Sequence, residues 1–323
     1  YNAYLDTGAI EARGLAPAQP YLDRIQAMET REDLAKVFAA NGFTAPVGGW
    51  VDVDSKQTDQ YIFYITQAGL GMGDRDYYLV DNDKNAELRA AYKAMLSSLL
   101  AAAGYDDADA AADQVIALET EIAKAHWDRA AGRNRNLTYN KVTKAELIAL
   151  GGAFPTATLI DALDLGDQAA FVVRQVTPTA EETAENGLDA DQLAKVSGGG
   201  VPGLFKVMQT APMDQWKAYL TAHLLIDTSD VLPASIDTVE NSVGEAVGKV
   251  YAARYFPAEN KAAMDQLVAN LRVALSQNLE NLDWMGAATK AEAEAKLDLF
   301  TPKIGYPEKF ETYDSLVVSD DAF

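Results

Sequence analysis

The sequence predicts a mainly α-helical fold that contains one small β-hairpin. Three long segments, residues 85–103, 109–127 and 258–282, repeat apolar residues at the three- and four-residue spacing of an amphipathic helix. Residues 50–65 are instead rich in β-branched and aromatic residues. A length of 323 residues is enough for about two domains, each with its own core. We therefore expect a multi-helix protein with a minor β element.

The hairpin is the first element with a clear pattern. Trp50–Val53 and Tyr61–Ile65 are predicted to be its two strands, because both are β-branched and aromatic. The polar segment Ser55–Gln60 between them is predicted to be the turn.

Two predicted helices follow. The helix at 85–103 ends before Gly104, a residue type that commonly follows a helix. Its apolar residues are Leu88, Tyr92, Met95, Leu96, Leu99 and Leu100. The helix at 109–127 carries an apolar stripe that includes Val115, Leu118, Ile122 and His126. We interpret both helices as parts of a core.

The longest predicted helix, at 258–282, follows Pro257 and is also interpreted as a core helix. Its apolar face consists of Met264, Leu267, Val268, Leu271, Leu275, Leu279 and Leu282. Trp284 and Met285 are interpreted as packing residues that close this helix. Thr289 is a candidate N-cap for a further helix at 290–299.

Three glycine- and proline-containing segments are expected to be irregular. Residues 177–187 and 197–203 lack an apolar period, and we interpret the second as a flexible connection. In residues 304–307, Gly305 allows an unusual backbone angle and Pro307 prevents continuation of a helix.

Composition excludes several classes of function. The net charge of −21 argues against nucleic-acid binding, which needs a clustered basic surface. The longest basic cluster, formed by Arg129, Arg133 and Arg135, is short and has no interleaved aromatic residues. Since there is no cysteine, disulfides and thiolate chemistry are excluded. No stretch reaches the roughly 18–20 apolar residues that a transmembrane helix requires.

The two histidines, His126 and His223, do not form a metal site by their spacing. A catalytic zinc takes three protein ligands, and zinc peptidase helices place two histidines one turn apart. These two are 97 positions apart, and neither has a second histidine at helical spacing. We interpret both as hydrogen-bonded core residues.

Gly69, Gly71 and Gly73 superficially resemble a phosphate-binding loop. The residues that follow, Asp74 to Tyr78, are acidic and aromatic, and the acidic side chains would repel a phosphate. We interpret the segment as a glycine-rich turn closed by an Asp-Arg-Asp ionic network above Tyr77 and Tyr78.

Paired carboxylates recur in the sequence, and we expect them on the surface, because none is flanked by the apolar residues that would raise a pKa. Examples are Asp52 with Asp54, Glu181 with Glu182, and Asp320 with Asp321. None is predicted to be a catalytic acid or base.

Five blocks carry a resemblance to a known family. They are Gly71–Leu79, Leu137–Lys141, Val243–Tyr251 with Arg254–Pro257, Leu282–Met285 with Thr289–Lys290, and Lys303–Pro307. In this order they resemble the neprilysin and endothelin-converting-enzyme family of zinc metallopeptidases. The absence of cysteine indicates a bacterial member, because animal members are disulfide-bonded.

The resemblance implies a domain organisation. Residues 1–244 would form a helical cap domain, and residues 245–323 would link it to, or partly belong to, a thermolysin-like catalytic domain absent from this chain. The cap would be the wall and size filter of a closed chamber in which peptides are hydrolysed. The resemblance also implies a secreted, periplasmic or envelope-associated protein.

The family's catalytic machinery is not matched here. Its single zinc ion is held by an HExxH helix and a downstream glutamate, and no position of this sequence matches those residues. We therefore assign no catalytic or metal-binding residue, and the substrate-binding residues stay unassigned. The chain alone is expected to be inactive, with peptides as substrates and the catalytic domain of the same protein as its partner.

One departure from the family lies near Ala234 and Ser235. The family normally carries a further substantial segment between the blocks on either side of this junction. We expect that a segment has been omitted here, although a natural deletion gives the same sequence.

Two other functions stay open. One is a non-catalytic peptide- or protein-binding module derived from such a peptidase, and the other is an acidic helical interaction scaffold.

Overall fold

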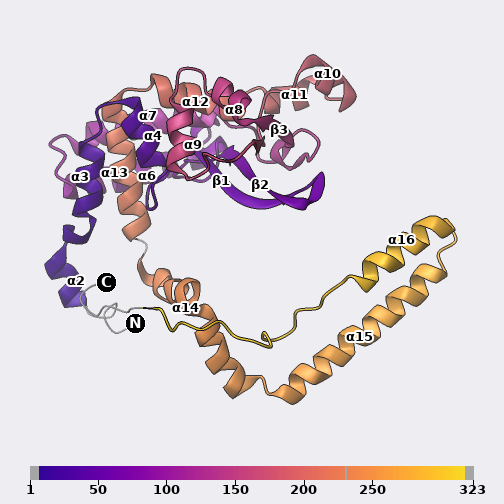
Figure 1. The fold of residues 1–323 in the computed structure, drawn as a ribbon. Coiled ribbons are helices and arrows are strands. Elements are labelled where there is room, and N and C mark those ends of the chain that lie inside the picture. Colours follow the sequence, from indigo (N-terminus) through magenta and orange to yellow (C-terminus); the bar gives the residue numbers. More distant parts are fainter. Residues whose placement is uncertain (1–6, 230, 317–323) are drawn as a thin grey trace. The chain divides into compact units, whose positions relative to one another are not determined.

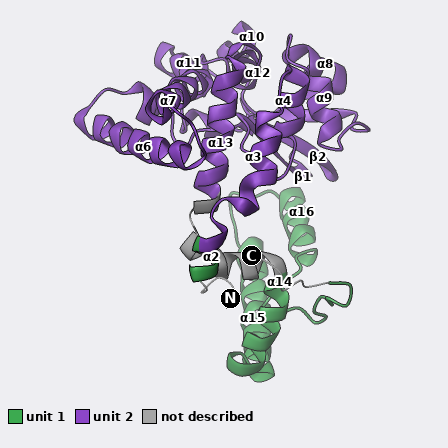
Figure 2. Cartoon of the chain, turned by 90° about the vertical axis from the view of Figure 1, so that its left-hand side faces the viewer, with its two compact units in different colours: residues 1–11, 230–323 green, residues 12–229 purple. Residues whose placement is uncertain are grey.

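A computed structural model describes residues 7–229 and 231–316. The chain folds into two compact units, which consist of residues 12–229 and of residues 1–11 with 230–323 (Figures 1 and 2). Helices dominate both units, which confirms the predicted fold class. None of the described helices is long and apolar enough to cross a membrane.

The larger unit contains a four-stranded sheet with the order β1-β2-β4-β3. The hairpin strands β1 (Val47–Asp54) and β2 (Gln57–Gln67) are antiparallel, as predicted, but the turn is shorter than predicted because β2 begins at Gln57. The sequence analysis missed β3 (Asn140–Thr143) and β4 (Ala170–Val173). β4 pairs with β2 in parallel and with β3 antiparallel, so these short strands depend on partners far away in the sequence.

Helix α7 (Ala108–Ala125) lies in the core of the larger unit. It packs against α5 (Asp76–Leu79), α6 (Asp83–Ala102), α12 (Gly200–Thr210) and α13 (Met213–Ser229). Its buried residues include Val115, Leu118 and Ile122, which confirms the stripe predicted for this helix. The other elements that begin in or before this unit are α2 (Thr7–Arg13), η1 (Ala16–Ala18), α3 (Gln19–Gln26), α4 (Arg31–Phe38), η2 (Ala131–Arg133), α8 (Lys144–Leu150), α9 (Thr156–Ala162), α10 (Ala180–Glu185) and α11 (Ala190–Val196).

Both segments of this unit that were predicted to be irregular contain helix. In residues 177–187, α10 is started by a capping box in which Thr179 and Glu182 bind each other's backbone N–H groups. Residues 197–203 are not a flexible connection, because α12 begins at Gly200. A Cβ at Gly198 would lie 2.7 Å from the carbonyl oxygens of Lys124 and His126, so glycine here permits close packing.

The smaller unit contains α14 (Val231–Tyr255), α15 (Ala258–Glu280) and α16 (Ala287–Asp298). α14 has non-helical dihedral angles at Val243. Arg272 of α15 donates a 2.8 Å hydrogen bond to the Leu297 carbonyl of α16, and Ser276 donates to Glu294 at 3.0 Å. These contacts hold α15 and α16 together as a pair.

The core role predicted for α15 is wrong within the described chain, because none of its residues is buried. Leu271 is 60% exposed, and Trp284 beyond the helix is 76% exposed rather than packed. Thr289 is not an N-cap, because α16 begins at Ala287 with Gly286 before it. Apolar spacing thus predicted the helix, but not a partner for its apolar face.

Near the end of the smaller unit, the backbone at Gly305 agrees with the prediction from the sequence. Gly305 adopts φ +70°, and a Cβ there would lie 2.7 Å from the Phe256 ring, so the turn needs glycine. Tyr306 packs edge-on against Phe256 with ring centroids 6.2 Å apart. The junction between Ala234 and Ser235 falls in a part of α14 whose side chains lie outside the described residues.

Candidate functional site

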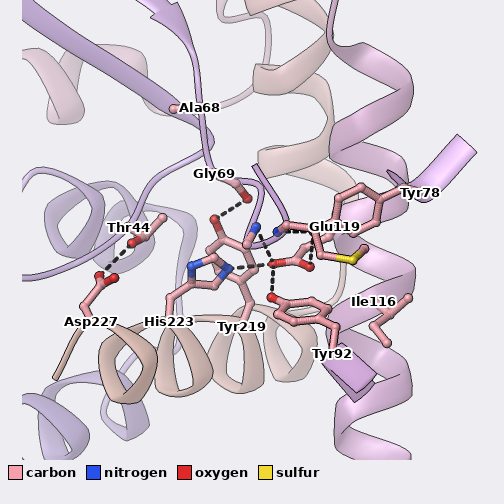
Figure 3. A network of polar contacts seen from close by, with 12 residues as sticks. Thr44, Ala68, Gly69, Tyr78, Tyr92, Ile116, Glu119, Tyr219, His223 and Asp227 are labelled. Carbon is pink, nitrogen blue, oxygen red and sulfur yellow. Dashed lines mark hydrogen bonds and ion pairs between the residues drawn. The ribbon is translucent and has the colours of Figure 1, made fainter. Parts of the chain in front are cut away.

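In the larger unit, a network of polar contacts surrounds the carboxylate of Glu119 (Figure 3). Glu119 lies on the buried face of α7, and its exposed fraction is 0%. An ionised carboxylate in such a position must be compensated by hydrogen bonds or by an opposite charge. The surrounding elements supply several donors.

Four groups donate hydrogen bonds to Glu119. Oε1 accepts from Tyr92 Oη at 3.0 Å, from the Gly71 N–H at 3.3 Å and from His223 Nε2 at 2.6 Å. Oε2 accepts from Tyr78 Oη at 2.8 Å. The donors come from α5, α6, α13 and the loop after β2. The carboxylate therefore joins α7 to four segments whose donor residues lie 27 to 104 positions from Glu119 in the sequence.

Two glycines allow the loop after β2 to approach this cluster. Gly69 has φ +86°, and its carbonyl accepts a 2.8 Å hydrogen bond from Tyr219 Oη. A Cβ at Gly71 would lie 2.0 Å from Tyr92 Oη. Glycine at these positions thus serves backbone geometry and close packing, in agreement with the interpretation of a glycine-rich turn.

The tyrosine hydroxyls of the cluster stay protonated. Burial raises the pKa of Tyr78 and of Tyr92, and the negative charge of Glu119 raises both further. Burial likewise raises the pKa of Tyr219. Because the phenols keep their protons, they act as fixed donors to a carboxylate and a carbonyl. With every side chain of the cluster at least nine-tenths buried, the arrangement cross-links the core.

His223 and His126 are both hydrogen-bonded core residues, which confirms the interpretation from the sequence. His223 is 5% exposed and its ring lies against Tyr219, with centroids 4.2 Å apart. His126 is 7% exposed, and its Nε2 lies 3.0 Å from the Ala68 carbonyl, so Nε2 carries a hydrogen. Burial lowers the pKa of His126 to about 4, although the hydrogen bond to Ala68 opposes this shift.

Two sequence interpretations near the cluster need correction. Arg75 does not bridge two aspartates, because its Nη1 donates to the His126 carbonyl at 2.9 Å and only Asp76 is near, 3.9 Å from Nε. Tyr78 is buried beneath the turn as expected, whereas Tyr77 is only half-buried.

Asp54, which was expected on the surface, is fully buried. Burial opposes its ionisation, but hydrogen bonds from Lys141 and Tyr139, both at 2.7 Å, lower its pKa to about 2. Lys141 and Tyr139 belong to β3 and the segment before it, so local sequence pattern could not predict that they contact Asp54 of the hairpin. Asp320 and Asp321 lie outside the described residues.

Comparison with known proteins identifies the family. The family model described as peptidase family M13, N-terminal part, matches residues 1–238 and 234–307. The chain belongs to peptidase family M13. This confirms the resemblance to the neprilysin and endothelin-converting-enzyme family.

Curated relatives of this M13 chain include two rat proteins. Endothelin-converting enzyme-like 1 is 26% identical over 285 residues, which cover 80% of this chain and 34% of the relative. Endothelin-converting enzyme 1 is 24% identical over an alignment of length 331 that covers 95% of this chain and 43% of the relative. The M13 chain thus spans about a third to two-fifths of the length of these relatives.

Solved structures of M13 proteins share the fold. The zinc metalloprotease Zmp1 of Mycobacterium tuberculosis in its open state is 28% identical, with a TM-score of 0.75 over 97% of this chain and 50% of that chain. PepO of Lactobacillus rhamnosis is 18% identical, with a TM-score of 0.62 over 96% of this chain and 51% of that chain, which shows the fold alone.

The residues described here do not fit a zinc site. Among them, no group of three histidine, cysteine, aspartate or glutamate side chains is placed to hold a metal. His126 and His223 are each committed to a hydrogen bond with another core group. We therefore assign no step of zinc chemistry to this part of the M13 protein.

The sequence analysis missed Glu119, although the sequence contains a signal for it. Glu119 follows Leu118 directly and lies three residues before Ile122, on the stripe predicted to be buried. A carboxylate on a buried helix face needs partners from other elements. Such a position could have been predicted to be the centre of a buried network, but not which elements supply the donors.

Proposed function

We propose that this chain is the N-terminal, mainly helical region of a zinc metalloendopeptidase, in which it forms the wall and size filter of a closed chamber that admits peptides. The zinc and the catalytic residues would lie in sequence outside these 323 residues. The observation that carries the proposal is the match of both units to the M13 family model, over residues 1–238 and 234–307. The chain also spans less than half of its curated relatives.

The proposed division places a helical cap at 1–244 and linking helices at 245–323. Along the chain, the boundary between the two compact units lies between residues 229 and 230, 15 residues before this proposed division. The apolar side chains left exposed on α14 and α15, among them Val250, Tyr251 and Leu271, support a role for the smaller unit as a junction with a further domain.

The proposal includes an omitted segment near Ala234. The family model matches in two pieces, and these overlap at residues 234–238. A continuous family member would be matched without such a break, so the two-piece match supports an omission or a deletion at this point.

As a peptidase of this kind, the protein would act in the periplasm, at the envelope or outside the cell.

The size filter can be tested with the complete protein. Two substrates would carry the same cleavable sequence, one as a free peptide of about ten residues and one as a loop of a stable folded domain. The proposal predicts zinc-dependent cleavage of the peptide and no cleavage of the folded substrate, although the latter is cut after unfolding. Equal cleavage of both substrates would contradict a chamber that selects by size. No cleavage of either would instead favour a binding module.

A further inference from the structure

The larger unit contains a polar cavity of about 550 Å³ whose lining includes Gly69 but not Glu119, Tyr78, Tyr92 or His223. Its walls are the loop after β2, the residues that follow α7, the η2 turn and the end of β4. A volume of this size lies in the range of about 300–1,000 Å³ that is typical of ligand sites. It has room for part of a peptide, not only for a single small ion.

The cavity is basic although the protein is strongly acidic. Its lining contains four arginines, Arg75, Arg129, Arg133 and Arg174, and one acidic residue, Asp74. The formal charge of the lining is therefore +4 − 1 = +3, whereas the chain has 27 basic and 48 acidic residues. Such a concentration of one basic residue type contrasts with the surrounding negative charge and favours an anionic ligand.

Two of the arginines are held in place by neutral groups. Arg75 Nη1 donates to the His126 carbonyl at 2.9 Å, and Arg75 Nε is buried without a hydrogen-bond acceptor. Arg174 Nη2 donates to the Gly132 carbonyl at 3.0 Å, and its guanidinium lies 5.7 Å from the centroid of the Trp50 ring. Backbone carbonyls and a ring orient these guanidinium groups, and the carboxylate of Asp76 lies 3.9 Å from Arg75 Nε.

The other two arginines lie on the exposed rim. Within the described part of the chain, Arg129, Arg133 and Arg174 form no ion pair with a carboxylate, and only Asp76, 3.9 Å away, pairs with Arg75. Guanidinium groups bind carboxylates through two parallel hydrogen bonds, which fix orientation as well as charge. Arg129, Arg133 and Arg174, which have no carboxylate partner among the described residues, are thus suited to a carboxylate ligand.

We propose that this basic pocket, defined by Arg75, Arg129, Arg133 and Arg174, binds a carboxylate group of a peptide. The choice of a peptide over a free anion rests on the proposed peptidase function and on the size of the cavity. The basic pocket selects peptides with an acidic side chain or a free C-terminus close to the segment that enters it.

Direct binding tests the proposal without any need for catalysis. The probe is a fluorescently labelled peptide with two glutamates and a free C-terminus, and its matched form has two glutamines and an amidated C-terminus. Fluorescence anisotropy of each would be measured with the protein at low ionic strength. We expect the acidic peptide to bind at least tenfold more tightly than the matched form, and equal affinities would overturn the proposal.

Variants distinguish binding by the arginines of the basic pocket from the effect of surface charge elsewhere on the protein. Arg129→Gln with Arg133→Gln removes two exposed charges, so the fold is preserved, and we expect a loss of affinity of at least tenfold. Arg135→Gln removes a nearby exposed charge outside the lining and is the matched control, with an expected change below twofold. A loss for Arg135→Gln equal to that for a single Arg133→Gln change would overturn the proposal.

Two further measurements test whether the paired hydrogen bonds of arginine matter and whether the ligand is a peptide carboxylate or free phosphate. Arg133→Lys keeps the charge but loses the paired hydrogen bonds, so a partial loss of affinity is expected. Inorganic phosphate should displace the labelled peptide only at concentrations far above the Kd of the peptide. Tight phosphate binding without peptide binding would overturn the peptide assignment. Because these readouts are independent of hydrolysis, a complete protein that binds the acidic peptide but hydrolyses no peptide would contradict the proposed function alone.

Discussion

Helices α7 and α15 have similar apolar periodicity but different surroundings. In α7, the apolar stripe is buried among α6, α12 and α13, and Val115, Leu118 and Ile122 have exposed fractions of at most 1%. In α15, none of the residues is buried, and Leu267 and Leu271 are 48% and 60% exposed. A stripe in the sequence therefore predicts that a helix has a face to cover, but not that the same chain covers it.

The difference extends to polar residues. α7 places the carboxylate of Glu119 in the core, where four donors from other elements bind it. In α15, by contrast, Ser276 and Arg272 bond to Glu294 and Leu297 of α16, the next helix of the smaller unit. The larger unit is thus stabilised by contacts between residues distant in sequence, and the described contacts of α15 are more local.

The largest effect is expected from Glu119→Ala. This change removes the acceptor for His223, Tyr78, Tyr92 and the Gly71 N–H, and leaves these donors buried without a partner. We expect the free energy of unfolding to fall by about 3–5 kcal/mol. Urea unfolding followed by circular dichroism would measure it. Asp113→Ala, on the exposed face of the same helix, is the control and should change stability little. A similar small loss for Glu119→Ala would mean that the cluster does not stabilise the core.

A matched pair of leucine variants compares the contributions of the two helices to stability directly. Leu118→Ala in α7 creates a cavity in the core and should lower stability by about 2–5 kcal/mol. Leu271→Ala in α15 removes an exposed side chain and should change it by about 0.5 kcal/mol or less. Urea unfolding of both variants would be compared with that of the original chain. A large loss for Leu271→Ala in this chain would show that its face is covered.

The pH dependence of stability gives a further, smaller effect. His126 is buried neutral, and its pKa falls from the usual 6.5 to about 4. The unfolded chain therefore binds the proton more readily, and the contribution is complete above pH 6.5 and is lost as pH falls towards 4. We expect His126 to account for a loss of roughly 3 kcal/mol over this range.

His126→Gln should reduce this dependence, because the side-chain amide of glutamine can place an N–H near the position of His126 Nε2, which contacts the Ala68 carbonyl, and glutamine does not titrate. Unfolding curves of both proteins would be compared at several pH values between 7 and 4. The charges that act on His126 are Arg75, which lowers its pKa, and Asp74, which raises it. Identical pH profiles would contradict a buried neutral His126.

The sequence was sufficient for the elements that depend on local pattern. The helices α6, α7 and α15 and the strands β1 and β2 lie close to their predicted ranges, because apolar spacing and β-branched composition act within each segment. The short strand β4 was missed because its four residues resemble any apolar run until they pair with β2 and β3. α10 was missed although Thr179 and Glu182 carry a capping-box signature.

The candidate site was less predictable. Both histidines were correctly interpreted as core residues, since neither has a second histidine at ligand spacing. Glu119 and Asp54 were missed because their burial results from tertiary contacts. Arg75 and Arg174 were not associated with Arg129 and Arg133, because they are brought together only by the loop after β2 and the end of β4.

The most direct test of the account is to measure zinc content and peptide hydrolysis for this 323-residue chain and for the complete protein, purified in parallel. We expect about one zinc ion per molecule and chelator-sensitive hydrolysis for the complete protein, with neither for the chain alone. Stoichiometric zinc and hydrolysis in the chain alone would contradict the central claim that it supplies the chamber and not the catalytic centre. A complete protein without zinc or hydrolysis would contradict the peptidase assignment itself.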